Sequence, residues 1–72
     1  MLISAVEAVV EAQTATTVYL QRCLEVGYVR AAKLIDAMEE LGIVTPPDGE
    51  RRRRVIMTRE QFLLWRTERE NG

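Results

Sequence analysis

The stretch from Gly27 to Gly42 limits the fold more than any other part of the chain, because it predicts one short helix with two unlike faces. Successive residues lie about 100° apart around a helix, and an apolar stripe centred on Met38 would face a core. Gly27 is expected to provide the tight turn into this helix, and Gly42 is expected to end it. The apolar stripe consists of Ala31, Leu34, Ile35, Met38 and Leu41, and the opposite face carries Val29, Lys33, Asp36 and Glu40.

Two helices are expected before this one, and a fourth after it. Apolar residues recur at helical spacing near the N-terminus, which predicts the first helix. The second is expected to run from an N-cap threonine, Thr16 or Thr17, to about Glu25. Thr58 and Gln61 form a capping-box pattern, which predicts a fourth helix running nearly to the C-terminus.

A small β-hairpin is predicted between the third and fourth helices. Ile43-Val44 and Val55-Ile56-Met57 are the expected strands, and Pro46-Pro47-Asp48-Gly49 is a turn signal between them. A hairpin after two short helices joined by a glycine turn is the order of a winged helix-turn-helix. The predicted fold class is therefore mostly α with a small β-hairpin. The winged helix-turn-helix domain is expected over residues 1–57, and a C-terminal helical extension over residues 58–72.

Composition restricts the classes of function. Seventy-two residues allow one small domain, and the formal net charge of −1 gives the whole molecule no long-range attraction for polyanions. A nucleic-acid surface must therefore be local, and the run Arg51-Arg52-Arg53-Arg54 is the cluster that qualifies. With no histidine and a single cysteine, we expect no catalytic residues, no metal ligands, no cofactor and no enzyme activity. No basic leader or long apolar run occurs, so we expect a cytoplasmic protein without a signal peptide or a membrane span.

The segment from about Val6 to Met57 resembles the gamma domain at the C-terminus of FtsK/SpoIIIE DNA translocases. The resemblance is carried by the stretch LQRCLEVGYVRAAKLIDAMEELGIV, from Leu20 to Val44. It is close to that family's pattern of Leu-Gln-Arg, Gly-Tyr-Asn-Arg-Ala-Ala-Arg, Met-Glu and Gly-Ile-Val. In that family the domain is a winged helix that reads a polar, G-rich chromosomal sequence, orients the motor and stimulates a Xer tyrosine recombinase. The resemblance implies double-stranded DNA as a partner, with a tyrosine recombinase or another protein as a further candidate.

The resemblance also assigns residues to the DNA. A recognition helix over about residues 28–41 is expected to enter the major groove, with the arginine-rich wing on the backbone. The side chains expected to face the bases are Val29, Lys33 and Asp36. Those expected to contact the backbone are Arg22, Arg30, Arg51, Arg52, Arg53 and Arg54.

Several positions depart from the family pattern. Lys33 stands where the family has an arginine, so the bidentate fork to guanine is lost. Val29 stands where the family has an asparagine, and its best base contact is a thymine methyl. Asp36 replaces a glutamate, and Glu25 replaces a basic or neutral residue. We therefore expect an altered sequence specificity.

No Walker lysine motif occurs, so we expect a free-standing protein without the motor, such as a bacterial or phage regulator.

Two functions stay open at this stage. The first is DNA binding, and the alternative is a protein-interaction module on the same fold, using an apolar patch of Val18, Tyr19 and Val29.

The fourth helix carries four consecutive large apolar residues, Phe62-Leu63-Leu64-Trp65, and one helix face cannot bury them all. We expect a homodimer with Phe62, Leu64 and Trp65 at its interface, which would supply two-fold symmetry. The alternative is that this helix caps the core of a monomer.

Overall fold

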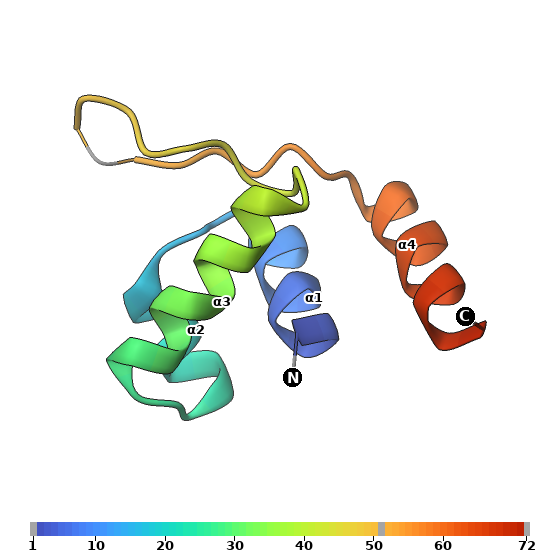
Figure 1. Ribbon diagram of the computed structural model, residues 1–72, viewed down its shortest axis with the longest axis horizontal. Helices are drawn as coiled ribbons and strands as arrows, with labels where there is room; N and C mark the ends of the chain where they lie inside the picture. Colours follow the sequence, from blue (N-terminus) through green and yellow to red (C-terminus); the bar gives the residue numbers. More distant parts are fainter. Residues whose placement is uncertain (1, 51, 72) are drawn as a thin grey trace.

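The computed structural model describes residues 2–50 and 52–71, over which the chain folds as four helices and a long connecting segment (Figure 1). The helices are α1 (Leu2–Ala12), α2 (Thr17–Leu24), α3 (Tyr28–Glu40) and α4 (Arg59–Asn71). The segment that joins α3 to α4, residues 43–57, is called the wing below. All four helices begin and end close to the positions expected from the sequence.

Side-chain caps explain where α2 and α4 begin. The hydroxyl oxygen of Thr16 accepts a hydrogen bond from the backbone N–H of Tyr19 at 3.1 Å. Thr58 accepts from the N–H of Gln61 at 3.1 Å, and the Gln61 side chain accepts from the N–H of Thr58 at 2.9 Å. The second pair is a complete capping box. Both start signals read from the sequence are confirmed.

The turn between α2 and α3 differs from the expectation, whereas the end of α3 agrees with it. Gly42 is left-handed at φ +79°, and the N–H of Ile43 donates to the carbonyl of Met38 at 2.9 Å, which closes α3 as a glycine C-cap does. The tight turn after α2 is at Glu25, with φ 54°, and not at Gly27. Because α2 ends at Leu24, its left-handed cap falls on Glu25. Gly27 is extended at φ −75° and serves as the N-cap of α3.

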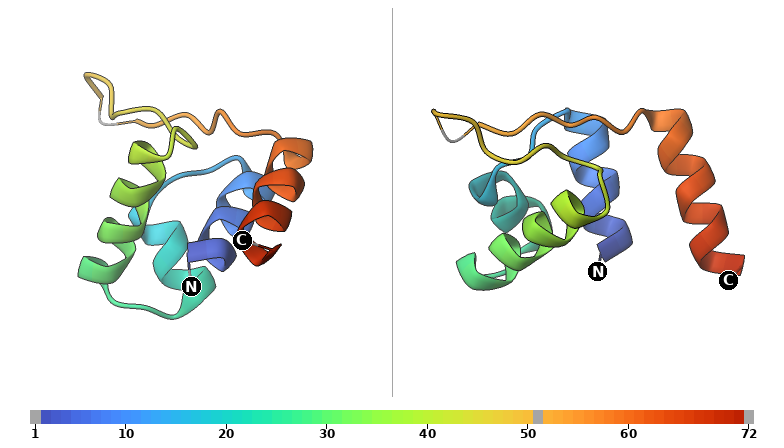
Figure 2. Two further views of the ribbon diagram at one scale, coloured as in Figure 1. Left: turned by 45° about the vertical axis from the view of Figure 1, so that its right-hand side comes forward. Right: turned by 45° about the horizontal axis from the view of Figure 1, so that its top comes forward.

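Helix α1 is the centre of the core. It contacts each of the other helices, whereas α4 contacts α1 and no other helix over the described residues. The two views in Figure 2 show α2 and α3 on one side of α1 and α4 on the other. The wing and α4 extend from this core toward opposite ends of the molecule (Figure 1). The buried apolar residues are Ala5, Val6, Val9, Val10, Ala15, Leu20, Ala31, Ile35, Met38, Ile43, Val44 and Phe62.

The β-hairpin predicted for the wing is not formed. Within the described part of the wing, the pairing is one isolated antiparallel bridge between Val44 and Val55. The backbone N–H of Ile56 donates to the carbonyl of Ile43 at 2.9 Å, which supports the bridge from its inner side. The two segments therefore run antiparallel in the expected register, but they do not become strands.

The residues outside the bridge explain why the pairing stops. The N–H of Thr45 donates to the carbonyl of Arg54 at 2.9 Å. The return bond is lost, because the N–H of Arg54 donates instead to the Thr45 hydroxyl at 2.8 Å. Pro46 and Pro47 follow, and neither has an N–H to donate to a ladder. The sequence thus contains the register of a hairpin but lacks the donors needed to extend it.

Candidate nucleic-acid interface

The outer face of α3 carries the side chains expected to face the bases. Val29 is 67% exposed, the side chain of Asp36 is 73% exposed, and Lys33 is exposed between them. Leu41 had been expected in the core stripe but is 44% exposed, because it caps the end of α3 instead of lying within the helix. The buried residues on the inner face of α3 are Ala31, Ile35 and Met38. The two-faced character read from the sequence is therefore present.

Exposed cations occur on α2, on α3 and on the wing. Arg22 lies in the last turn of α2 and Arg30 near the start of α3, and both side chains are exposed. On the wing, Arg52 and Arg54 are exposed, and Nε of Arg52 lies 3.5 Å from a carboxylate oxygen of Glu50. An exposed pair of this kind contributes little stability and exchanges partners readily. Arg51, also expected at the backbone, lies outside the described residues.

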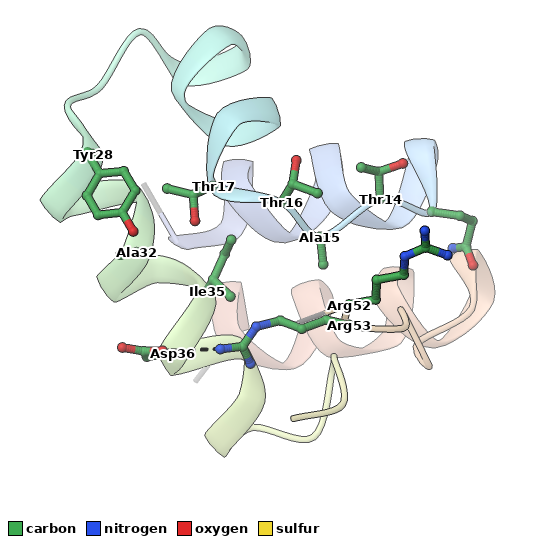
Figure 3. A pocket seen from close by; sticks show the side chains of 11 residues that line it. Thr14, Ala15, Thr16, Thr17, Tyr28, Ala32, Ile35, Asp36, Arg52 and Arg53 are labelled. Atoms are coloured by element: carbon green, nitrogen blue, oxygen red, sulfur yellow. Dashed lines mark ion pairs between the residues drawn. The ribbon is translucent and has the colours of Figure 1, made fainter. Parts of the chain in front are cut away.

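Arg53 differs from the wing arginines on either side of it. Its Nη2 lies 3.6 Å from Oδ1 of Asp36 (Figure 3). Its Nη1 contacts the carboxylate of Glu39. Nη1 also donates to the carbonyl of Thr45 at 3.4 Å. The side chain is 17% exposed, against 80% for Arg52. The side chain of Arg53 therefore points toward α3, whereas the sequence analysis assigns all four wing arginines alike to the DNA backbone.

An open cleft of about 620 Å³ lies between the α1–α2 connection, the first half of α3 and the wing. Figure 3 shows Thr16 and Thr17 on one wall of this cleft, with Arg52 and Arg53 reaching in from the wing. Two arginines and several hydroxyl groups suit an anionic partner more than an apolar one. The cleft is continuous with the outer face of α3 through Asp36.

Asp48 organises the tip of the wing. Its Oδ1 accepts hydrogen bonds from the backbone N–H groups of Glu50 at 2.8 Å and Arg52 at 2.9 Å. The N–H of Asp48 in turn donates to the carbonyl of Arg52 at 2.9 Å. The hydrogen bonds from Arg52 and then Glu50 lower the pKa of the Asp48 carboxyl below its usual value. The turn signal in the sequence therefore corresponds to a closed loop held by one carboxylate.

The apolar patch of the alternative hypothesis is exposed only in part. Val18 is 57% exposed and Val29 is 67% exposed, but Tyr19 is half-buried. A hydrogen bond with the thiol of Cys23 raises the pKa of Tyr19. Tyr28, which the sequence analysis did not select, is 65% exposed near the same surface. The exposed apolar side chains here are therefore Val18, Tyr28 and Val29.

The expected dimer residues of α4 lie in different environments. Phe62 is 3% exposed and packs in the core of its own chain, so it is not available on an outer face. Trp65 is half-buried, with its ring centroid 6.2 Å from that of Phe62. Leu64 is 68% exposed and Leu63 is 43% exposed. The side chains available for the predicted dimer interface are therefore Leu63, Leu64 and the exposed part of Trp65. The dimer itself stays a prediction.

Within residues 2–50 and 52–71, no three histidine, cysteine, aspartate or glutamate side chains lie close enough together to hold a metal ion. None of the helices in this part of the chain has the length and apolar character to cross a membrane.

Comparison with known proteins agrees with this geometry. The family model described as the Ftsk gamma domain matches residues 1–58. DNA translocase SpoIIIE of Bacillus subtilis is 50% identical over 58 residues, which is 81% of this chain and 7% of the relative. DNA translocase FtsK of Listeria monocytogenes is 57% identical over 51 residues, or 71% of this chain and 7% of the relative. DNA translocase FtsK of Corynebacterium glutamicum is 41% identical over 66 residues, or 89% of this chain and 7% of the relative.

Helices α2 and α3 form a helix-turn-helix that packs on α1, and this is the helical part of a winged-helix domain. The wing follows α3. The chain belongs to the FtsK gamma-domain family. In FtsK this domain is a small, non-catalytic, DNA-binding regulatory domain. The chain spans about 7% of the length of the translocases it matches.

Proposed function

We propose that this chain binds double-stranded DNA, with α3 in the major groove and the wing on the phosphate backbone. The observation that carries the proposal is the exposed outer face of α3, together with exposed cations on α2, on α3 itself and on the wing. Within the described residues, Arg22, Arg30, Lys33 and Arg54 form no ion pair with another side chain. Cations without partners are the ones that can replace counterions on DNA.

The base-facing residues are Val29, Lys33 and Asp36, and their chemistry supports a specificity different from that of the family pattern. Lys33 can donate to guanine as a point charge, without the paired geometry of arginine. Val29 can contact a thymine methyl, and a carboxylate such as Asp36 can accept from the amino group of cytosine. None of these three contacts matches the bidentate reading of guanine and adenine.

The backbone contacts are assigned to Arg22, Arg30 and the wing. Arg52 and Arg54 are exposed on the wing, and Arg51 is included by its place in the same run. These residues supply affinity and orientation, and they carry little sequence information. The proposed function includes no catalytic step, no metal and no cofactor, and we place the protein in the cytoplasm as a bacterial or phage regulator.

Binding to random and G-rich duplexes at increasing salt tests the proposal. We expect the logarithm of the affinity to fall linearly with the logarithm of the salt concentration over about 50–200 mM, with a steep slope. Fluorescence anisotropy with labelled duplexes measures both the slope and the preference. No binding at the lowest salt contradicts the proposal.

A second candidate is a protein-interaction module, because Val18 and Val29 are exposed on adjacent helices. Val18, Tyr19 and Val29 would then contact a protein partner, and the family suggests a tyrosine recombinase as the class to try. Val18→Ser distinguishes the two functions, since Val18 is assigned no DNA contact. Loss of recombinase binding with unchanged DNA binding would favour the second function.

We further propose that residues 1–57 form the DNA-binding domain, that residues 58–72 form an added helical extension, and that the extension supports a homodimer. The support is that α4 contacts α1 and no other helix over the described residues, and that it exposes Leu63 and Leu64. Burial of a leucine side chain stabilises a contact by about 1.5–3 kcal/mol. Sedimentation of the chain and of Leu64→Asp tests the dimer. A wild-type monomer at high micromolar concentration contradicts it.

A further inference from the structure

The base of the wing is packed in the core through the buried side chains of Ile43 and Val44. Among the described residues beyond this base, Arg53 forms the ion pairs that join the wing to α3. The backbone pairing in the described part of the wing is one isolated bridge, and the loop beyond it is exposed from Pro46 to Glu50. Over the same residues, the ion pairs between the wing and α3 are those that Arg53 makes with Asp36 and Glu39. The position of the outer part of the wing, beyond the bridge, relative to α3 therefore depends strongly on one guanidinium group.

The arrangement uses the shape of the guanidinium group as well as its charge. The two terminal nitrogens of Arg53 contact two different carboxylates, one turn apart on α3. A lysine carries the same charge on one compact ammonium group and cannot bridge two acids in this way. The contact with Glu39, between side chains that are 17% and 36% exposed, is also less screened by salt than the contacts of the exposed arginines, whereas Asp36 is 73% exposed.

We propose that Arg53 is a positioning residue for DNA binding: by bridging Asp36 and Glu39, it holds the wing beside α3 and turns Arg52 and Arg54 toward the phosphates. This inference rests on the proposed function. A wing that is ordered before binding loses less conformational entropy when the complex forms. The two carboxylates, which by charge alone would repel DNA, act as the anchor of the wing.

The sharpest test compares Glu39→Gln with Glu40→Gln. Each change removes one negative charge from α3, so charge alone predicts that both strengthen DNA binding. Glu39 contacts Arg53, whereas Glu40 is exposed and forms no ion pair within the described residues. We expect Glu39→Gln to weaken binding by about fivefold and Glu40→Gln to leave it unchanged or stronger. If Glu39→Gln binds as tightly as Glu40→Gln, the proposal is overturned.

Substitutions of Arg53 itself separate anchoring from phosphate contact. We expect Arg53→Lys to weaken binding by about fivefold and Arg53→Gln by about tenfold. The double variant Arg53→Gln with Glu39→Gln should bind no more weakly than Arg53→Gln alone, since both changes remove the same contact. Wild-type affinity of Arg53→Lys, or losses that simply add in the double variant, would make Arg53 an ordinary phosphate ligand.

Hydrogen exchange in the absence of DNA gives an independent readout. The amide of Thr45, which donates to the carbonyl of Arg54 at 2.9 Å, should exchange faster in Arg53→Gln than in the wild type. Arg52→Gln, which changes an exposed side chain, should leave that rate unchanged. Equal rates in the two variants contradict the anchoring. A wild-type chain that binds no duplex contradicts the proposed function instead, and the exchange rates then still decide whether Arg53 holds the wing.

Discussion

The arginines of α4 and the arginines of the wing are alike in the sequence but differ in their partners. Arg59 lies 3.9 Å from a carboxylate oxygen of Glu11, and Arg66 lies 3.6 Å from one of Glu7, so both join α4 to α1. The guanidinium carbon of Arg66 also lies 5.6 Å from the centroid of the Phe62 ring. Arg66, at 36% side-chain exposure, is therefore engaged within the chain, whereas the pair of Arg59, at 76% exposure, is weak in the same way as that of Arg52 with Glu50.

The region around α3 and the wing shows the opposite pattern. Arg54 and Lys33 are exposed without an ion pair among the described residues, and the partner of Arg52 is the exposed Glu50. Among the described arginines of this region, Arg53 is the one held at low exposure by carboxylates of another element. In a chain with a net charge of −1, the number of arginines in a segment does not show which of them are available to an anionic partner. Their exposure and their intramolecular ion pairs do.

The largest effect is expected on the α4 side. Phe62→Ala should lower the free energy of unfolding by about 3–5 kcal/mol, because it leaves a cavity where α4 packs on the core. Leu64→Ala is the matched control, since Leu64 is 68% exposed, and it should cost less than about 0.5 kcal/mol. Urea unfolding at low protein concentration measures both. Equal losses for the two variants would mean that α4 does not pack on α1 as described.

A smaller effect is expected on the α3 side. Val29→Asn with Lys33→Arg should give a preference for the G-rich family sequence, because asparagine pairs with adenine and arginine with guanine, each through two hydrogen bonds. The expected discrimination is roughly 1–3 kcal/mol for each good pair. Competition between G-rich and random duplexes measures it. If the double variant binds both alike, α3 does not dock in the groove as it does in the family.

The smallest effect is expected in the α2–α3 turn, where two substitutions of Glu25 separate backbone strain from charge as contributions to stability. Glu25 is left-handed at φ 54°, where a side chain is strained, so Glu25→Gly should raise the free energy of unfolding by about 1 kcal/mol. Glu25→Ala removes the same charge but keeps the Cβ, and it should give no such gain. Thermal unfolding compares the two. A gain shared by both variants would assign the effect to charge instead of backbone strain.

The helices could be predicted from the sequence because their start and stop signals are local. The capping box of Thr58 with Gln61 and the left-handed Gly42 act within a few residues, and both are confirmed. The turn at Glu25 was missed because glycine is the usual left-handed residue, and Gly27 stood close by. The hairpin was overestimated because Pro46 and Pro47 were read as a turn signal, without counting the donors that they remove.

The candidate site was less predictable, because it depends on contacts between distant residues. A helical wheel placed Val29, Lys33 and Asp36 on one exposed face, as the structure has them. A wheel could not show that Arg53 turns back to Asp36, which lies on a different element. The available signal was the pair of acids one turn apart on α3. Nothing local distinguished Arg53 from Arg52 as their partner.

The most direct test of DNA binding by the wing compares matched pairs of arginines from the two regions. Arg52→Ala with Arg54→Ala should weaken binding about equally on all duplexes and make the salt slope shallower by up to about two units. Arg59→Ala with Arg69→Ala removes the same charge from α4 and should change the slope much less. Anisotropy titrations over about 50–200 mM salt give both slopes. Equal changes for the two pairs would contradict the account.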